Sequence, residues 1–170
     1  MLPFIALLLG IVGLSGAAGA QVGEWTLHRN ERFGFSFRYP ADVFALERSS
    51  ETGDGEVFAG ARGQGRLLVG AFANDGGHSV ETYRRYVAKN SYAGFGIHYA
   101  PRGQTWFVLS GEDAGRVFYE KVMFSCGGRL INSFVIMYPI ENKREFDPIV
   151  SGIEKTFRPG QDCSQHASQP

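Results

Sequence analysis

The segment RLINSFVIMY, residues 129–138, decides the fold of this chain of 170 residues. Both alternating sets of its side chains are apolar: Leu130, Phe134 and Ile136 in one set, and Ile131, Val135 and Met137 in the other. A strand with apolar side chains on both faces is typical of the middle of a sheet that is covered on both sides. Pro139 cannot donate a ladder hydrogen bond and is expected to end the strand. The pattern therefore predicts a central strand at residues 129–138, buried on both faces.

The residues that follow this strand predict an amphipathic helix. Apolar side chains recur there at helical spacing, at Phe146, Ile149, Val150, Ile153 and Phe157. Asp147 and Pro148 suit the N-cap and the first helical position, which favours a helix start at that point.

The residues before the central strand predict the rest of the domain. Alternating or apolar segments indicate strands at residues 25–28, 35–39, 56–61, 66–73, 96–100, 105–110 and 116–125. Ser79 suits a helix N-cap and Glu81 is favourable in a first turn, so a first helix is expected to begin there. Short connections between strands favour antiparallel pairing. The expected fold class is α+β, a single antiparallel β-sheet with two main helices packed on it.

The first twenty residues predict export. Residues 3–13 form an almost unbroken apolar run, and small residues follow it, with Ala18 and Ala20 in the A-x-A pattern of a cleavage site. The run is too short to be a permanent membrane anchor. We therefore expect a signal peptide over residues 1–20, cleavage before Gln21, and a secreted or periplasmic protein with no transmembrane segment in the mature chain. The expected remainder is one domain over residues 21–160 and a polar tail over residues 161–170.

The two cysteines and the charge balance limit the classes of partner. The chain has two cysteines, Cys126 and Cys163, and an even number of cysteines in an exported protein favours a disulfide. The alternatives to a disulfide are two free thiols or participation in a metal site. The chain has 17 basic and 17 acidic residues and no basic cluster, so nucleic acid and anionic membranes are poor partners.

Motifs that would carry catalysis or bind a cofactor are missing from the sequence. The four histidines, at positions 28, 78, 98 and 166, show no tight metal-ligand spacing, and there is no G-x-S-x-G nucleophile motif. Residues 74–79 open a helix and could hold an anion, but they lack the lysine of a phosphate-binding loop. We expect no cofactor, no metal and no catalytic residues, although a catalytic group assembled in space stays open.

One aromatic-rich region is a candidate contact patch. It comprises Tyr92, Phe95, Tyr99 and Trp106, with Glu120 and Lys121 as polar orienters. Because side chains alternate along a strand, Glu120 and Lys121 are expected on opposite faces and not paired with each other. A structural ion pair or hydrogen bond is the alternative role for each. Core packing is the alternative role for the aromatic residues, and their exposure together would mark a contact surface.

Two terminal segments resemble the PsbP-like superfamily. Residues 33–44, FGFSFRYPADVF, resemble its opening element, and residues 153–158, IEKTFR, resemble the end of its last helix. Residues 106–111 and 118–121 also resemble segments of small exported alphaproteobacterial proteins. The resemblance covers most of residues 25–160 and implies a PsbP-like α/β sandwich. The superfamily includes an extrinsic photosystem subunit and DcrB-like periplasmic proteins, so it also implies an accessory or binding role without a shared catalytic site.

These observations lead to one main hypothesis and two alternatives. The main hypothesis is an exported, non-enzymatic accessory or binding module for a protein partner or a small ligand. The first alternative is an exported hydrolase or metal-dependent enzyme with a spatially assembled site. The second is a structural protein of the envelope.

Overall fold

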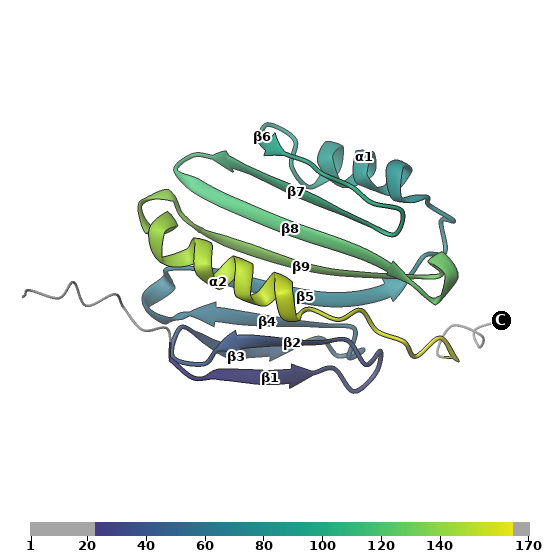
Figure 1. The fold of residues 1–170 in the computed structure, drawn as a ribbon, viewed down its shortest axis with the longest axis horizontal. Helices are drawn as coiled ribbons and strands as arrows, with labels where there is room; N and C mark the ends of the chain where they lie inside the picture. Colours follow the sequence, from purple (N-terminus) through teal and green to yellow (C-terminus); the bar gives the residue numbers. More distant parts are fainter. Residues whose placement is uncertain (1–22, 165–170) are drawn as a thin grey trace, which may run out of the picture.

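The computed structural model describes residues 23–164, which form a seven-stranded antiparallel sheet, a two-stranded sheet and two helices. The order of strands in the large sheet is β3-β4-β5-β9-β8-β7-β6 (Figure 1). Its strands are β3 (Phe44–Ser49), β4 (Gly55–Gly60), β5 (Arg66–Ala73), β6 (Gly96–Tyr99), β7 (Trp106–Asp113), β8 (Arg116–Ser125) and β9 (Leu130–Pro139). The predicted signal peptide and its cleavage site lie outside the described residues, as does the end of the tail.

The prediction of a single sheet was wrong, because β1 (Trp25–Arg29) and β2 (Ser36–Pro40) form a separate two-stranded sheet. The second edge of β2 is occupied by the chain that follows the last helix. Ser36 and Arg158 exchange two backbone hydrogen bonds, and the Arg38 amide donates to the Thr156 hydroxyl. The hairpin instead packs its buried side chains, including Phe35 and Phe37, into the core beneath the large sheet.

The two helices pack on opposite faces of the large sheet. Helix α2 (Lys143–Thr156) buries Phe146, Ile149 and Ile153 in the core cluster that contains Leu130 and Phe134. Helix α1 (Val80–Asn90) packs in a second cluster with side chains of β7 and β8 and the other face of β9. Figure 1 shows α1 near one edge of the sheet, beside β7. The larger helix and the β1–β2 hairpin therefore cover one face broadly, whereas α1 covers only part of the other.

Helix α2 begins at Lys143, five residues before Pro148, the predicted first helical position. A 3₁₀ turn at Ile140–Asn142 leads directly into it, and Lys143 pairs with Asp147 one turn later at 3.0 Å. Pro148 therefore lies inside the helix and not at its first position. The favourable pairing of side chains four apart contributes to this first turn although proline removes one backbone donor.

Strand β9 is the central strand, as predicted, but its two faces are not equally buried. On the α2 side, Leu130, Phe134 and Ile136 are fully buried. On the α1 side, Ile131 is buried, whereas Val135 and Met137 are only half-buried. The prediction of burial on both faces was wrong for the second half of the strand, because α1 stops short of it.

The start of α1 gives a first test of these local interactions. The Ser79 hydroxyl accepts a hydrogen bond from the Thr82 amide at 3.2 Å, which confirms the predicted N-cap. Ser79→Ala is expected to lower the free energy of unfolding by about 1 kcal/mol, because it leaves this amide without its cap. Chemical denaturation measures the loss. Ser79→Asp keeps an acceptor and serves as the control; an equal loss in both variants would contradict the capping role.

Candidate functional site

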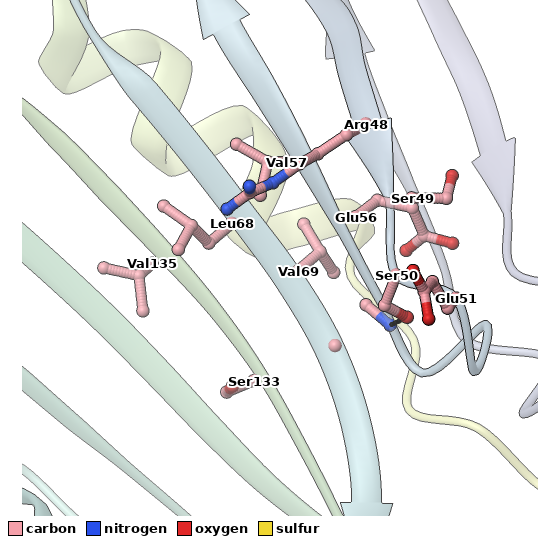
Figure 2. A pocket seen from close by; sticks show the side chains of 12 residues that line it. Arg48, Ser49, Ser50, Glu51, Glu56, Val57, Leu68, Val69, Ser133 and Val135 are labelled. Atoms are coloured by element: carbon pink, nitrogen blue, oxygen red, sulfur yellow. Dashed lines mark hydrogen bonds between the residues drawn. The ribbon is translucent and has the colours of Figure 1, made fainter.

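Within residues 23–164, no helix covers the α1 face of the large sheet over β3, β4, β5 and half of β9. We call this surface the open face; its apolar side chains are Val57, Leu68, Phe72, Val135 and Met137. Leu68 and Phe72 are each 39% exposed, although both are large apolar residues. A shallow hollow of about 590 Å³ lies here, and Figure 2 shows Val57, Leu68 and Val135 along its floor. Water therefore meets a contiguous apolar floor made by neighbouring strands.

Two glycines keep part of this floor flat. Gly55 and Gly70 face each other across β4 and β5. A Cβ at Gly70 would lie 3.0 Å from the Asp54 carbonyl oxygen, and one at Gly55 would lie 3.3 Å from the Val69 carbonyl oxygen. Both contacts are with backbone, which cannot move aside cheaply. Side chains at these positions are therefore disfavoured, and the hollow stays open.

Charged residues line one rim of the open face. The Arg48 side chain extends from β3 over Val57 toward Leu68, and Glu51 lies at the other end of the same rim (Figure 2). Arg66 pairs with Glu47 at this rim. Among the described residues, neither Arg48 nor Glu51 has an ion pair or a side-chain hydrogen bond. The rim therefore offers one free cation and one free anion beside an apolar floor.

Aromatic side chains form the opposite rim, beside α1. Tyr83 lies 6.0 Å from Phe72 and 5.9 Å from Tyr86, between ring centroids, and His78 packs against both tyrosines. A smaller hollow of about 330 Å³ lies among these rings. Tyr86 is exposed. Sequence analysis did not identify this rim.

The structure divides the predicted contact patch between the two faces of the sheet. Tyr92, Phe95 and Glu120 lie on the α1 side, inside the core or at its border. The Tyr92 ring stacks on Phe118 with centroids 3.8 Å apart, and its hydroxyl donates to the Glu120 carboxylate. Burial raises the pKa of Glu120 to about 7, and it also raises the pKa of Tyr92. These three residues are therefore parts of the core and not of one exposed surface.

The remaining three residues of the predicted patch lie on the α2 side. Lys121 Nζ lies 3.0 Å from Glu154 Oε1 and 5.5 Å from the centre of the Trp106 ring. Tyr99 is 56% exposed, and it lies close enough to Tyr119 to influence its pKa. Glu120 and Lys121 thus point to opposite faces, as predicted. Lys121 and Trp106 contact each other, and we call these two residues and Tyr99 the second surface.

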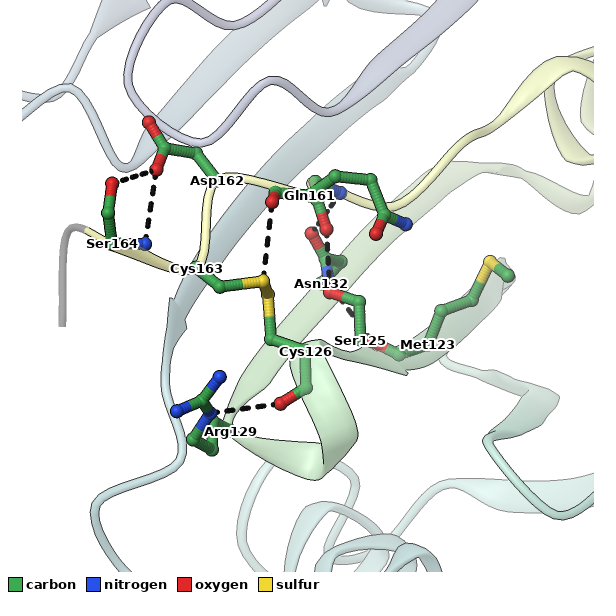
Figure 3. Close-up of a disulfide and its surroundings, with 10 residues drawn as sticks. Met123, Ser125, Cys126, Arg129, Asn132, Gln161, Asp162, Cys163 and Ser164 are labelled. Atoms are coloured by element: carbon green, nitrogen blue, oxygen red, sulfur yellow. Dashed lines mark hydrogen bonds between the residues drawn. A yellow bond between two sulfur atoms is a disulfide. The ribbon is translucent and has the colours of Figure 1, made fainter.

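The C-terminal segment is fastened to the end of the sheet by a disulfide. Cys126 and Cys163 are bonded, with Cα atoms 5.6 Å apart, as predicted (Figure 3). Beside them, the buried Asn132 side chain accepts from the Gly160 amide at 2.8 Å and donates to the Ser125 hydroxyl at 3.0 Å. Ser125 in turn donates to the Gly160 carbonyl. This network, which sequence analysis missed, holds Gly160 against β8 and β9.

Buried acidic groups were not identified as a set from the sequence. Glu56 is buried on the α2 side, where Asn30 Nδ2 donates to its Oε1 at 2.7 Å and His28 Nε2 lies 3.4 Å from the same atom. These contacts tie the β1–β2 hairpin to β4.

Within residues 23–164, no group of three or more His, Cys, Asp or Glu side chains is placed to hold a metal. In the same part of the chain, no helix has the length and apolar character needed to cross a membrane.

Comparisons with known proteins find likeness at the level of structure. No family model and no curated protein sequence matches the chain. The solution structure of cyanobacterial PsbP from Synechocystis sp. PCC 6803 matches with a TM-score of 0.59 and 14% identity, over 88% of this chain and 99% of that one. The Ran-binding protein Mog1p of Saccharomyces cerevisiae matches with a TM-score of 0.62 and 10% identity, over 85% and 99%. LpqN of Mycobacterium tuberculosis, involved in cell envelope biogenesis, matches with a TM-score of 0.54 and 13% identity, over 81% and 91%. At this level of identity the likeness shows the fold alone, and the chain has the PsbP-like fold that its sequence predicted.

Proposed function

We propose that this protein is an exported, non-enzymatic accessory or binding module whose contact surface is the open face. One observation carries the proposal. Val57, Leu68 and Val135 belong to three neighbouring strands and lie on the part of the α1 face that no helix of residues 23–164 covers. A large exposed apolar patch with polar rims is typical of an interaction site.

The shape of the open face favours a protein partner over a small ligand. Sites for small molecules enclose most of the ligand surface. The hollow here has a flat floor of strands and is open to solvent. Because the chain has 17 basic and 17 acidic residues, recognition is expected to depend on shape and apolar contact more than on long-range steering. The yeast Ran-binding neighbour supports the proposal, since it carries a protein-binding role on this fold.

Export is part of the same proposal. The disulfide between Cys126 and Cys163 is compatible with an oxidising compartment. The neighbour involved in cell envelope biogenesis is compatible with it as well. N-terminal sequencing of the protein from periplasmic material is expected to begin at Gln21. Recovery of the full-length chain from the cytoplasm alone would contradict export.

A charge placed on the open face tests its role. Leu68→Glu is expected to reduce partner capture from the periplasm at least tenfold, because it places an unpaired carboxylate on the apolar floor. Its thermal stability is expected to stay near that of the wild type, since Leu68 is already partly exposed. Quantitative mass spectrometry of captured proteins gives the measurement. Leu27→Glu, at an exposed leucine of β1 in the other sheet, is the matched control.

Two results would overturn the proposed function. One is an unchanged set of captured proteins with Leu68→Glu. The other is turnover of a substrate by the purified protein that is lost on mutation of a clustered acid–base pair, which would favour the enzyme hypothesis. Selective loss of capture with Tyr99→Ala, at the second surface, would instead move the contact site to Tyr99, Trp106 and Lys121. A structural role in the envelope predicts co-purification with envelope material and no discrete partner.

A further inference from the structure

We propose that the open face binds a second copy of the same chain across a two-fold axis, with Arg48 of one copy opposite Glu51 of the other. The inference rests on the proposed function, because it identifies the occupant of the same surface. It does not require that the second copy be the only occupant. Two features of the open face support the inference: the size of its apolar floor and the two free charges on its rim. The balance of charge over the whole chain is a third support.

The floor is large enough for a weak dimer. Four strands spaced about 4.8 Å apart, each presenting about six residues of about 3.3 Å, give a plane of roughly 400 Å². Side-chain relief and the rims add to the accessible area. Two such faces together bury about 800 Å², which is below the lower end of stable specific interfaces, about 1,200 Å², and in the range of weak, transient encounters. A reversible association at micromolar concentrations is therefore expected, and not an obligate dimer.

The rim charges are suited to a symmetric contact. Arg48 and Glu51 line the same hollow, and no other described side chain pairs with either. In a two-fold interface, a contact of residue i with residue j occurs twice. Consider a two-fold axis that lies in the plane of the contact, runs perpendicular to the strands and passes between the two residues. This axis places Arg48 of each copy opposite Glu51 of the other copy. The Arg66–Glu47 pair is already satisfied within each copy and needs no new partner.

The overall charge does not oppose the association. The chain has 17 basic and 17 acidic residues, so two copies approach without net repulsion. One free cation and one free anion on the rim make the face complementary to itself. A strongly basic or acidic partner would meet a like charge at one of the two positions.

Sedimentation equilibrium of the mature protein from about 1 to 500 μM tests the inference. The wild type is expected to show a concentration-dependent dimer. Arg48→Glu and Glu51→Arg are each expected to weaken the dimer at least tenfold, because each places like charges opposite each other twice. The double variant R48E/E51R restores opposite charges and is expected to recover most of the association. Leu68→Glu is expected to abolish it, and Leu27→Glu to leave it unchanged.

The outcomes separate this inference from the proposed function. A monomer at every concentration overturns the dimer, while loss of capture by Leu68→Glu would still support a contact surface for another protein. A dimer that survives Leu68→Glu, or a double variant no tighter than the single ones, also overturns the inference. Circular dichroism and thermal unfolding of each variant exclude misfolding as the cause. A dimer that follows the charge pattern without any other captured partner supports the second copy as the occupant.

Discussion

Replacing both Cys126 and Cys163 by serine is expected to lower the free energy of unfolding by about 4 kcal/mol. The disulfide closes a loop with a sequence separation of 37. In the chain-entropy model, a cross-link over such a loop removes roughly 13 cal/mol/K from the unfolded ensemble, which corresponds to about 4 kcal/mol at 25 °C. Urea denaturation of the wild type and of the double variant measures the difference.

The wild type under reducing conditions is the natural control for this experiment. It should lose as much stability as the double serine variant, because the covalent sequence is otherwise intact. A loss below about 1 kcal/mol in both cases would show that the Asn132–Ser125–Gly160 hydrogen bonds already hold the segment in place. It would also show that the unfolded chain gains little freedom from the broken link.

The apolar pattern of residues 129–138 predicted the position of the strand correctly and its environment incompletely. A run with apolar residues on both faces indicates that both faces contact something other than water. The sequence cannot distinguish a helix of the same chain from a separate molecule as that contact. At Ile131 the contact is the core under α1, whereas Val135 and Met137 are only half-buried, and Met137 packs against the border of that core. The same signal that predicts a covered strand thus also marks the candidate site.

The contact patch shows a second limit of sequence analysis. Alternation along a strand placed Glu120 and Lys121 correctly on opposite faces. It could not show that Tyr92 stacks on Phe118 of β8 and contacts Glu120, because this depends on how the residues after α1 fold back onto the sheet. The hairpin of β1 and β2 was assigned to the wrong sheet for a similar reason. The outer edge of β2 forms hydrogen bonds with Arg158 and Thr156, which lie more than a hundred residues later in the chain.

The wild-type protein is expected to be less stable at pH 8 than at pH 5 because of Glu120. Burial raises the pKa of this carboxyl from 4.5 to about 7, and only the Tyr92 hydroxyl opposes the shift. Between pH 4.5 and about pH 7, the Glu120 carboxyl keeps its proton in the folded protein, whereas it has lost the proton in the unfolded chain. Stability therefore falls as the pH rises through this interval. Each pH unit is worth about 1.4 kcal/mol, so the loss over the interval is about 3 kcal/mol.

The variant Glu120→Gln separates the contribution of Glu120 to the pH dependence of stability from the contributions of the other titratable groups. Glutamine keeps the shape and can still contact Tyr92, but it has no charge to bury. The variant is expected to lose most of the pH dependence between pH 5 and 8, and to be more stable than the wild type at pH 8. Asp54 and Glu81 have lowered pKa values, so both stay ionised across this window. Urea denaturation at several pH values measures the slope. Glu154→Gln, at the partly exposed partner of Lys121, is the control and should keep the wild-type slope. If the wild type and Glu120→Gln show the same slope, the Glu120 carboxylate is already ionised in the folded protein and a cation or water must reach it beneath α1.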